Sequence, residues 1–368
     1  MSLTAADRQQ LRQSCTRVLP GTVPCSPAQD FRRLADWCEA NGITHDAYGE
    51  GPLVEGFEQK VATLLGLPAA VFMPSGVMAQ GVAMRIWTEA AGVRRIGLHP
   101  TSHLLLHEDQ AWSALFGLHA VPLGQAGRPL QAEDLAGCGQ PLAALIHELP
   151  IREAGGRLPS WDGLQALKAL ARQRGVRLHM DGARLWESAA GFGRSPAEIA
   201  AGFDSVYVSF YKGIAALTGA MLLGDADFVA QARLWRHRMG GTLYHLSPMV
   251  ASAAMQFDER LALMPVLLQR ARTLAAALAP LPGLRVDPDP PHVNLLHLWF
   301  DASADAVQDA RDTVAAESGC WLFGGVRAAD VPHWSRVELS VDDNLLQLTD
   351  EQVLPLFRRL CELMRSGR

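Results

Sequence analysis

Two apolar runs that each lead to a charged residue constrain the fold of this chain more than any other feature. The first, residues 176–180, runs directly into Asp181, and the second, residues 205–210, leads to Lys212. A buried parallel strand delivers a side chain to the open carboxyl edge of its sheet in this way. The pattern therefore predicts an α/β fold with Asp181 and Lys212 at neighbouring strand ends.

Lysine is rare in this chain, which holds only Lys60, Lys168 and Lys212. Lys60 falls on a polar helical face and Lys168 in the helical stretch 161–175, so we expect both to be solvated. A carboxylate and an amine at neighbouring strand ends suit pyridoxal phosphate, whose aldehyde binds a lysine and whose ring nitrogen needs an acidic partner. Taken singly, the aspartate could be a helix cap and Lys212 a surface lysine.

Three motifs resemble a known family: Asp-Gly-Ala-Arg at 181–184, Asp-Ser-Val at 204–206 and Lys-Gly at 212–213. They are similar to those of the threonine aldolases and β-eliminating lyases, which are pyridoxal-phosphate enzymes. The similarity implies the aspartate-aminotransferase fold, called fold type I. It also implies an amino acid substrate and a homodimer or homotetramer whose sites are completed by two chains.

This fold consists of a large cofactor-binding domain and a small α+β domain. For this chain the resemblance implies a mostly parallel seven-stranded sheet in a large domain of residues 47–246. The small domain is then built from residues 1–46 and 247–368. The active site is expected at the carboxyl ends of the strands.

The resemblance also implies roles for individual residues. Lys212 holds the cofactor and carries a proton, Asp181 keeps the pyridine nitrogen protonated, and His103 lies against the ring. The residues thereby assigned to the cofactor are Ser75, Gly76, Val77, His103, Asp181, Arg184, Ser209 and Lys212. Those assigned to the substrate are Tyr48, Arg184 and Arg336, of which the arginines bind its carboxylate.

Several of these residues have a plainer interpretation when considered alone. Residues 75–77 open a predicted helix whose free N–H groups attract phosphate, yet such turns are usually simple N-caps. Tyr48 lies in a glycine-rich turn that needs no further role. Likewise, His103 could be a structural histidine, and Arg336 opens a strand in which an arginine needs no function.

The loop after the predicted strand 142–148 departs from the threonine aldolase pattern. That pattern is Glu-Asn-x-His-Asn, whose histidine is positioned to take the β-hydroxyl proton of the substrate. This chain keeps the glutamate of the motif as Glu148. It has Pro150 and Ile151 in the part of the motif that runs from the asparagine to the histidine. The groups that remain nearby are Glu148, Glu153, His103, His107 and a bound water. Of these we expect His103, or a water that it holds, to substitute, and the more apolar wall to favour bulky β-substituents.

Two further positions also differ from the family. Tyr211 stands where a serine directly precedes the lysine, and Tyr244 aligns with an arginine thought to reach phosphate across the dimer. The leading function is carbon–carbon cleavage of a β-hydroxy-α-amino acid to glycine and an aldehyde. The alternatives are β-elimination or dehydration with the same cofactor, or a non-catalytic relative that only binds the cofactor.

Composition narrows the class of protein further. The net charge of −5 provides no basic patch for nucleic acid. The sequence has no evident apolar run of membrane-spanning length and no signal peptide at its start, so we expect a cytoplasmic protein without a membrane partner. The six cysteines lack zinc-ligand spacing, which predicts reduced thiols and no metal site.

Three segments outside the predicted site carry further expectations. An amphipathic helix over residues 27–40 should pack on the second domain through an apolar face. A long helix from residue 247 toward residue 279 should be interrupted at Pro265. The Pro-rich stretch 282–291 reads as a loop.

Overall fold

The computed structural model describes residues 3–23 and 25–366. Contacts between Cα atoms divide these residues into two compact units. The large unit holds residues 25–154 and 158–263, and the small unit holds residues 3–23, 155–157 and 264–366. The large unit is thus wider than the predicted domain of residues 47–246, because it also takes in residues 25–46 and 247–263.

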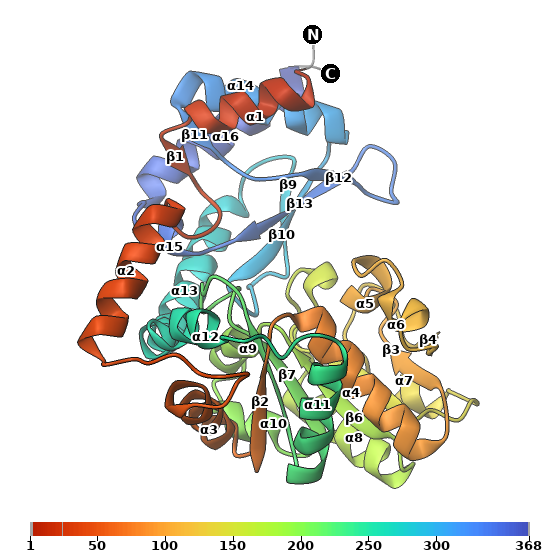
Figure 1. Cartoon of the computed structure of the whole chain (residues 1–368). Coiled ribbons are helices and arrows are strands. Elements are labelled where there is room, and N and C mark those ends of the chain that lie inside the picture. The colour runs from red at the N-terminus through yellow and green to blue at the C-terminus, as the bar shows by residue number, and fades with distance from the viewer. Residues whose placement is uncertain (1–2, 24, 367–368) are drawn as a thin grey trace. The chain divides into compact units, whose positions relative to one another are not determined.

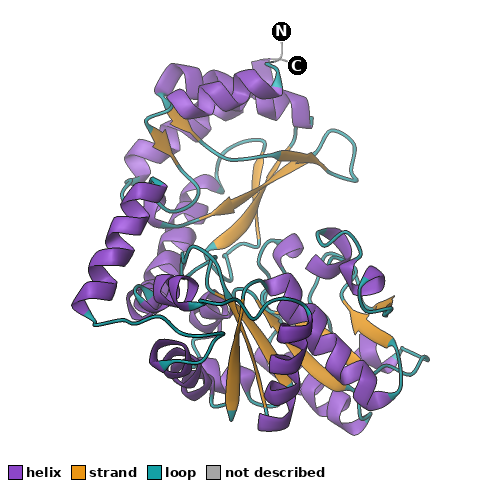
Figure 2. Ribbon diagram, in the orientation of Figure 1, coloured by secondary structure: helices purple, strands orange, loops and turns teal. Residues whose placement is uncertain are grey.

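A seven-stranded sheet forms the centre of the large unit (Figure 2). Its strands are β2 (Ala69–Met73), β3 (Arg95–Leu98), β4 (His119–Pro122), β5 (Ala144–Glu148), β6 (Arg177–Gly182), β7 (Ser205–Ser209) and β8 (Ala220–Gly224). In space they follow the order β2-β8-β7-β6-β5-β3-β4. Only β8 is antiparallel to its neighbours, so β2 runs in the same direction as the other five strands. The predicted mostly parallel seven-stranded sheet is confirmed.

Helices pack on both faces of this sheet (Figure 1), with α4 and α11 on one face and α8 on the other. Because both faces are covered, the inner strands are nearly continuous apolar runs, as expected for a parallel sheet. The helices of the large unit are α2 (Pro27–Ala40), α3 (Pro52–Leu65), α4 (Gly76–Ala91), α5 (His103–Leu106), α6 (Ala111–Ala114), α7 (Ala132–Ala136), the 3₁₀ turn η1 (Arg152–Ala154), α8 (Trp161–Gln173), α9 (Leu185–Phe192), α10 (Pro196–Ala200), α11 (Ala226–Arg238) and α12 (Ser247–Ala254).

A buried hydrogen-bonded chain fixes α4 on the sheet. Trp87 Nε1 donates to Ser205 Oγ at 2.8 Å, and this hydroxyl lies 2.7 Å from His179 Nδ1. On the other side of the ring, His179 Nε2 lies 2.8 Å from Gln80 Oε1. Burial lowers the pKa of His179 to about 3, so the ring is neutral and every member of the chain has a partner. The chain thereby holds α4 on the sheet at Gln80 and Trp87.

The helix at residues 27–40 forms as predicted, but its packing differs from the prediction. None of its residues is buried, and Phe31 leaves 60% of its surface exposed. Contacts group α2 with the large unit instead of the small one. The amphipathic pattern therefore identified the helix but not what its apolar side packs against.

The helix expected from residue 247 is two helices, α12 and α13 (Phe257–Leu278). The break lies before Phe257 and not at Pro265, which is inside α13. Gln256 explains the break, because its side chain donates to the carbonyl oxygens of Ala215 and Ser252. Among the described residues, α13 alone is long and apolar enough to cross a membrane, a test that core helices of soluble proteins also pass.

The small unit is an α+β module with its own core. An antiparallel sheet of order β12-β13-β10-β9 and a two-stranded parallel sheet, β1-β11, make up its strands. They are β1 (Arg17–Val18), β9 (Leu284–Asp287), β10 (Leu295–Phe300), β11 (Cys320–Trp321), β12 (Val326–Ala328) and β13 (Ser335–Ser340). The helices are α1 (Ala5–Ser14), α14 (Ala304–Ser318), α15 (Asp343–Leu346), α16 (Asp350–Ser366) and the part of α13 from residue 264 onward.

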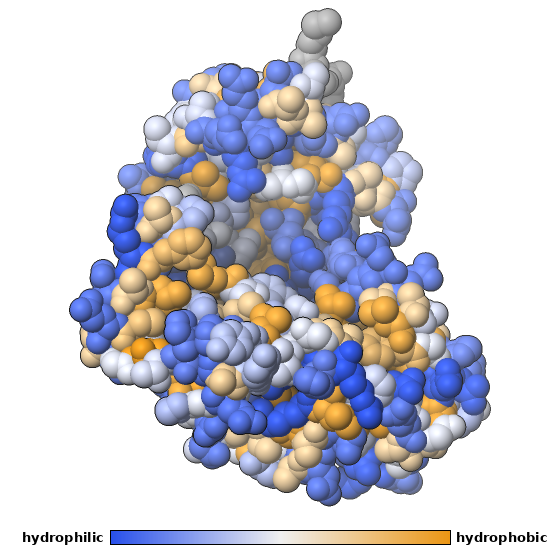
Figure 3. All heavy atoms as spheres, viewed as in Figure 1, coloured by the Kyte–Doolittle hydropathy of each residue, from blue (hydrophilic) through white to orange (hydrophobic). Residues whose placement is uncertain are grey.

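The sheet and helices of this unit pack around a single apolar cluster that includes Phe300, Phe323 and Phe357. Mostly hydrophilic atoms cover α1 at the surface seen in Figure 3. β9 corrects the prediction of a loop over residues 282–291. The loop was predicted from the prolines of this stretch. The structure instead follows the alternation of Leu284 and Val286, both of which are buried on one side of the strand.

Lys168 corrects the expectation that this lysine is solvated. Its side chain is buried, and its Nζ donates to Ile199 O at 2.9 Å and lies 4.9 Å from the centre of the Phe203 ring. Burial lowers the pKa of this amine to about 8. Lys60 is exposed, as expected, and pairs with Asp258 at 2.6 Å.

The buried lysine predicts a pH-dependent stability. Its pKa is about 8 in the folded state against 10.5 in the unfolded chain, so between these values only the unfolded state binds the proton. The free energy of unfolding should therefore rise with pH, by about 2 kcal/mol between about pH 7 and about pH 9.5. Denaturant titrations of the wild type and Lys168→Met should diverge by this amount, whereas Lys60→Met should follow the wild type. Parallel curves for Lys168→Met would contradict the assignment.

Candidate active site

Six strands of the large unit place their carboxyl ends at one edge of the sheet: β2, β3, β4, β5, β6 and β7. All eight predicted cofactor residues end or follow one of these strands. Ser75, Gly76 and Val77 come after β2, His103 after β3, Asp181 near the end of β6, Ser209 at the end of β7, and Lys212 and Arg184 in the turns that follow β7 and β6. The structure therefore gathers these eight residues at the edge where a ligand of this fold class binds.

Asp181 and Glu148 are direct neighbours across the β5–β6 pair. Their Cα atoms are partners in the parallel register, and Leu149 N donates to Asp181 O at 2.9 Å just beyond them. Paired positions on adjacent strands point to the same face of a sheet, so the two carboxyl groups lie on the face that α4 covers. Asp181 Oδ1 accepts from Ala183 N at 3.1 Å, and the residue is only 3% exposed.

Glu148 is a functional candidate that the sequence offered as one of several groups near the missing base, behind His103. Its Oε1 accepts a hydrogen bond from Arg152 N at 3.2 Å, while its buried Oε2 has no hydrogen-bond partner among the described residues. Burial, followed by the charge of Asp181, raises the pKa of this carboxyl to about 8. Its position at the end of the predicted strand 142–148 is the sequence signal that could have singled it out.

Lys212 follows β7 in a partly buried position. Burial lowers the pKa of its amine, and the charge of Arg184 lowers it further, while Asp181, Glu148 and Glu187 act in the opposite direction. These opposing effects mean that the amine lies within electrostatic range of both strand-end carboxyls. A lysine with a lowered pKa has more of the free amine that condenses with a carbonyl.

The first turn of α4 approaches the sheet closely at Gly76. A Cβ atom at this position would collide with the hydroxyl group of Tyr207, so only glycine fits. Ser75 caps the helix by accepting from Met78 N at 3.3 Å, and Val77 is exposed on the first turn. The plain N-cap interpretation is thus true of the Ser75 side chain, and the first N–H groups of the helix remain the donors for an anion.

Tyr207 was missed by the sequence analysis. Burial raises its pKa well above 10, and Tyr211 and Asp181 raise it further, so the hydroxyl keeps its proton. The signal was present in β7, where Ser205, Tyr207 and Ser209 alternate with two valines. Such alternation puts all three polar side chains on the face shared with Asp181.

Two histidines lie side by side after β3. His103 Nδ1 is 3.0 Å from Glu108 Oε1, and His107 Nε2 is 3.2 Å from Glu153 Oε1. The centres of the two rings are 5.1 Å apart. Each imidazole is therefore oriented by a carboxylate of its own, and His103 remains 36% exposed.

The residues predicted to contact substrate lie on three different elements. Arg184 precedes α9 and is close enough to lower the pKa of both Glu148 and Lys212. Tyr48 occupies a turn with a positive φ, where its N–H donates to Tyr244 O at 2.9 Å and its ring meets that of Tyr244 edge-on. Tyr244, noted above as replacing a family arginine, thus supports the Tyr48 turn.

Arg336 belongs to the small unit. It lies on β13, where its guanidinium is 3.4 Å from His297 Nδ1 and 5.8 Å from the centre of the Trp299 ring. Both neighbours come from the adjacent strand β10. Its assignment to the substrate carboxylate stays a prediction.

The chemistry of the donor set fits pyridoxal phosphate. The edge offers an amine with a lowered pKa at Lys212, a buried carboxylate at Asp181 and a helix start at Gly76 whose lack of a Cβ brings backbone N–H groups close to the sheet. These are the groups that an aldehyde, a pyridine nitrogen and a phosphate require. The roles of the individual residues stay predictions.

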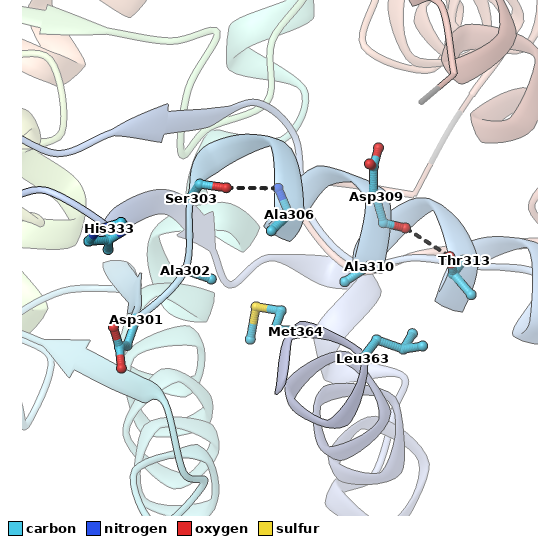
Figure 4. Close-up of a pocket in the computed structure, with 10 residues that line it drawn as sticks. All are labelled: Asp301, Ala302, Ser303, Ala306, Asp309, Ala310, Thr313, His333, Leu363 and Met364. Carbon is cyan, nitrogen blue, oxygen red and sulfur yellow. Dashed lines mark hydrogen bonds between the residues drawn. The ribbon is translucent and has the colours of Figure 1, made fainter. Parts of the chain in front are cut away.

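A groove of about 740 Å³ in the small unit has a different character (Figure 4). It lies between α14 and the end of α16. Its polar groups serve the helix: Ser303 accepts from Ala306 N at 3.3 Å, and the Thr313 hydroxyl donates to Asp309 O at 2.9 Å. This groove contains no amine nucleophile.

Comparison with known proteins identifies the family of this chain. The family model described as beta-eliminating lyase matches residues 33–302. A Listeria monocytogenes protein assigned provisionally as an L-allo-threonine aldolase has a solved structure that superposes with a TM-score of 0.90, at 34% identity, covering 96% of this chain and 99% of that one. An Exiguobacterium protein assigned provisionally as an aromatic amino acid beta-eliminating lyase or threonine aldolase superposes with a TM-score of 0.89, at 35% identity and the same coverage.

More distant relatives agree with this assignment. The Arabidopsis thaliana low-specificity L-threonine aldolase 1 is 24% identical over 298 residues, which is 78% of this chain and 83% of the relative. The Sphingomonas wittichii serine palmitoyltransferase, at 17% identity and a TM-score of 0.68, covers 95% of this chain and 87% of its own, and shares the fold alone. The predicted resemblance is confirmed: with its seven-stranded sheet and its residues 33–302 matched, the chain belongs to the beta-eliminating lyase family.

Proposed function

We propose that this protein is a pyridoxal-phosphate-dependent lyase that cleaves a β-hydroxy-α-amino acid to glycine and an aldehyde. The observation that carries the proposal is the cluster of Lys212, Asp181 and Glu148 at the ends of three adjacent strands or in the turn beyond them. The relatives named as threonine aldolases support this choice of reaction.

The residues at the sheet edge have separate roles in binding the cofactor and in moving protons. Lys212 binds the cofactor aldehyde and later moves a proton at the substrate Cα, for which a lowered amine pKa is suited. Asp181 holds the proton on the pyridine nitrogen. When bound, the cofactor accepts the electron pair that bond cleavage leaves on Cα.

Other residues bind and orient. The start of α4, from Ser75 to Val77, offers N–H donors to the phosphate, Ser209 lies beside this site on β7, and His103 covers the ring. Arg184 and Arg336 bind the substrate carboxylate, a task for which a guanidinium offers two parallel donors. Tyr48 contacts the substrate from its turn.

The loop after β5 bears on the choice of substrate. Pro150 and Ile151 replace the polar family motif, and Ile151 is fully buried. A wall without an imidazole or amide favours an apolar side chain on the substrate Cβ, since burying polar groups there would cost hydrogen bonds. We therefore propose a preference for bulky or aromatic β-substituents over threonine.

Two broader properties remain proposals by analogy. We propose a cytoplasmic homodimer or homotetramer, because proteins of this fold usually complete their sites with a second chain. Sedimentation of active protein tests this assembly, and an active monomer of 39.8 kDa would exclude it.

The cofactor assignment predicts a single labelled lysine. Purified protein supplied with pyridoxal phosphate should be yellow, and borohydride reduction followed by peptide mapping should place the label on Lys212. Lys60 is the internal control, because it is exposed and paired with Asp258. A label confined to Lys60 or Lys168 would overturn the assignment.

The reaction assignment predicts which products form. Incubation with threonine, allo-threonine and phenylserine should give glycine and the matching aldehyde, fastest from phenylserine if the apolar wall sets the preference. Ammonia and a keto acid should not accumulate, and their formation without glycine would identify a dehydratase or β-eliminating lyase instead. No product from any of the three would remove the aldolase proposal.

A further inference from the structure

One carboxyl oxygen at the sheet edge has no hydrogen-bond partner within the described part of the chain. The buried Oε2 atom of Glu148 makes no hydrogen bond to any described residue, although Oε1 of the same carboxyl is held by Arg152 N at 3.2 Å. A buried carboxyl oxygen without a hydrogen bond lowers the stability of the folded protein. Such an atom therefore either destabilises the fold without a function or hydrogen-bonds to a ligand. Its place beside Asp181, at the ligand-binding edge of the sheet, favours a ligand.

Aldol cleavage needs such an acceptor. A base must take the β-hydroxyl proton, and the family imidazole is missing because Pro150 and Ile151 occupy its loop. The nearby alternatives are His103, His107 and Glu153. His103 and His107 are each hydrogen-bonded through one ring nitrogen, to Glu108 and Glu153, which also engages Glu153. Glu148 differs from these residues in having a buried carboxyl oxygen with no partner among the described residues.

We propose that Glu148, through Oε2, accepts the proton of the substrate's β-hydroxyl group in place of the missing imidazole. This inference rests on the aldol cleavage proposed above and replaces His103 in that role. The oxygen–hydrogen bond of the hydroxyl breaks, and its proton moves to Oε2. The freed electron pair forms the carbonyl of the departing aldehyde, while the Cα–Cβ bond breaks and leaves its pair on Cα. Lys212 then returns a proton to Cα, which gives glycine, and Glu148 releases its proton to solvent.

The charges around Glu148 suit a base that works near neutral pH. Asp181 on β6 disfavours ionisation of Glu148, whereas Arg184 before α9 and Lys212 after β7 favour it, as does the Arg152 N–H. The balance, dominated by burial, leaves the pKa of Glu148 at about 8. A carboxylate with an ordinary pKa would be a far weaker base toward a hydroxyl.

The first test needs neither cofactor nor substrate. Infrared difference spectra of the cofactor-free protein, recorded from about pH 6 to about pH 10, should show the carbonyl band of a protonated carboxylic acid that disappears around pH 8. Glu148→Gln should remove this band. Glu153→Gln is the matched control, since Glu153 is a buried carboxyl in the adjacent turn η1, and it should retain the band.

The second test separates the two proton transfers in the loaded enzyme. Glu148→Gln should slow glycine release from phenylserine by about a hundredfold or more, the usual size of general-base catalysis. It should leave exchange of the glycine α-proton with deuterated solvent near the wild-type rate, because Lys212 carries out that step. Glu148→Asp keeps a carboxyl with a shorter reach and should be intermediate. In the wild type, kcat/KM should rise with pH through about 8, and this rise should be absent in Glu148→Gln.

The outcomes distinguish the inference from the function on which it rests. Wild-type protein that makes no glycine defeats the proposed function. Wild-type protein that makes glycine, with Glu148→Gln equally fast and equally pH-dependent, overturns the role of Glu148. The absence of a titrating carboxylic acid band in the wild type overturns it as well, even if Glu148→Gln fails to fold.

Discussion

The parallel register between β5 and β6 determines how the charged groups of the candidate site affect one another. It makes Glu148 and Asp181 direct neighbours at the carboxyl edge of the sheet. Two carboxyl groups on adjacent strands lie about 5 Å apart at their Cβ atoms and cannot both ionise without compensation. Lys212 and Arg184 supply part of that compensation. Burial has the largest effect, and together with the charge of Asp181 it raises the pKa of Glu148 to about 8, within reach of a base that works near neutral pH.

The rest of the large unit supports this edge. The hydrogen-bonded chain from Trp87 through Ser205 and His179 to Gln80 locks α4 on the face where the carboxyls point. Gly76 lets the first turn of that helix meet Tyr207 without a clash. A helix start, a lysine and two carboxyls are thereby fixed on rigid elements, which is what catalytic geometry requires.

The sequence predicted the parts of this site that depend on local pattern, namely the buried strands and the charged residues that end them. It could not reveal the pairing of Glu148 with Asp181, since register depends on contacts between strands far apart in the chain. Burial of Lys168 was hidden for a similar reason: a polar position on an isolated helix gives no sign of Ile199 and Phe203. Gln256 breaks α12 from α13 through a tertiary contact that outweighs the local signal of Pro265.

The most direct measurement of the central claim, that the sheet edge is an electron-sink site built around Asp181, is a comparison of Asp181→Asn with the wild type. The variant should still bind pyridoxal phosphate at Lys212, because the amine and its surroundings remain. Its kcat should fall by a hundredfold or more, about 3 kcal/mol, since a neutral amide cannot hold the proton on the pyridine nitrogen. A variant with normal cofactor content and near-normal kcat would show that Asp181 merely orders the turn at Ala183, and would contradict the account.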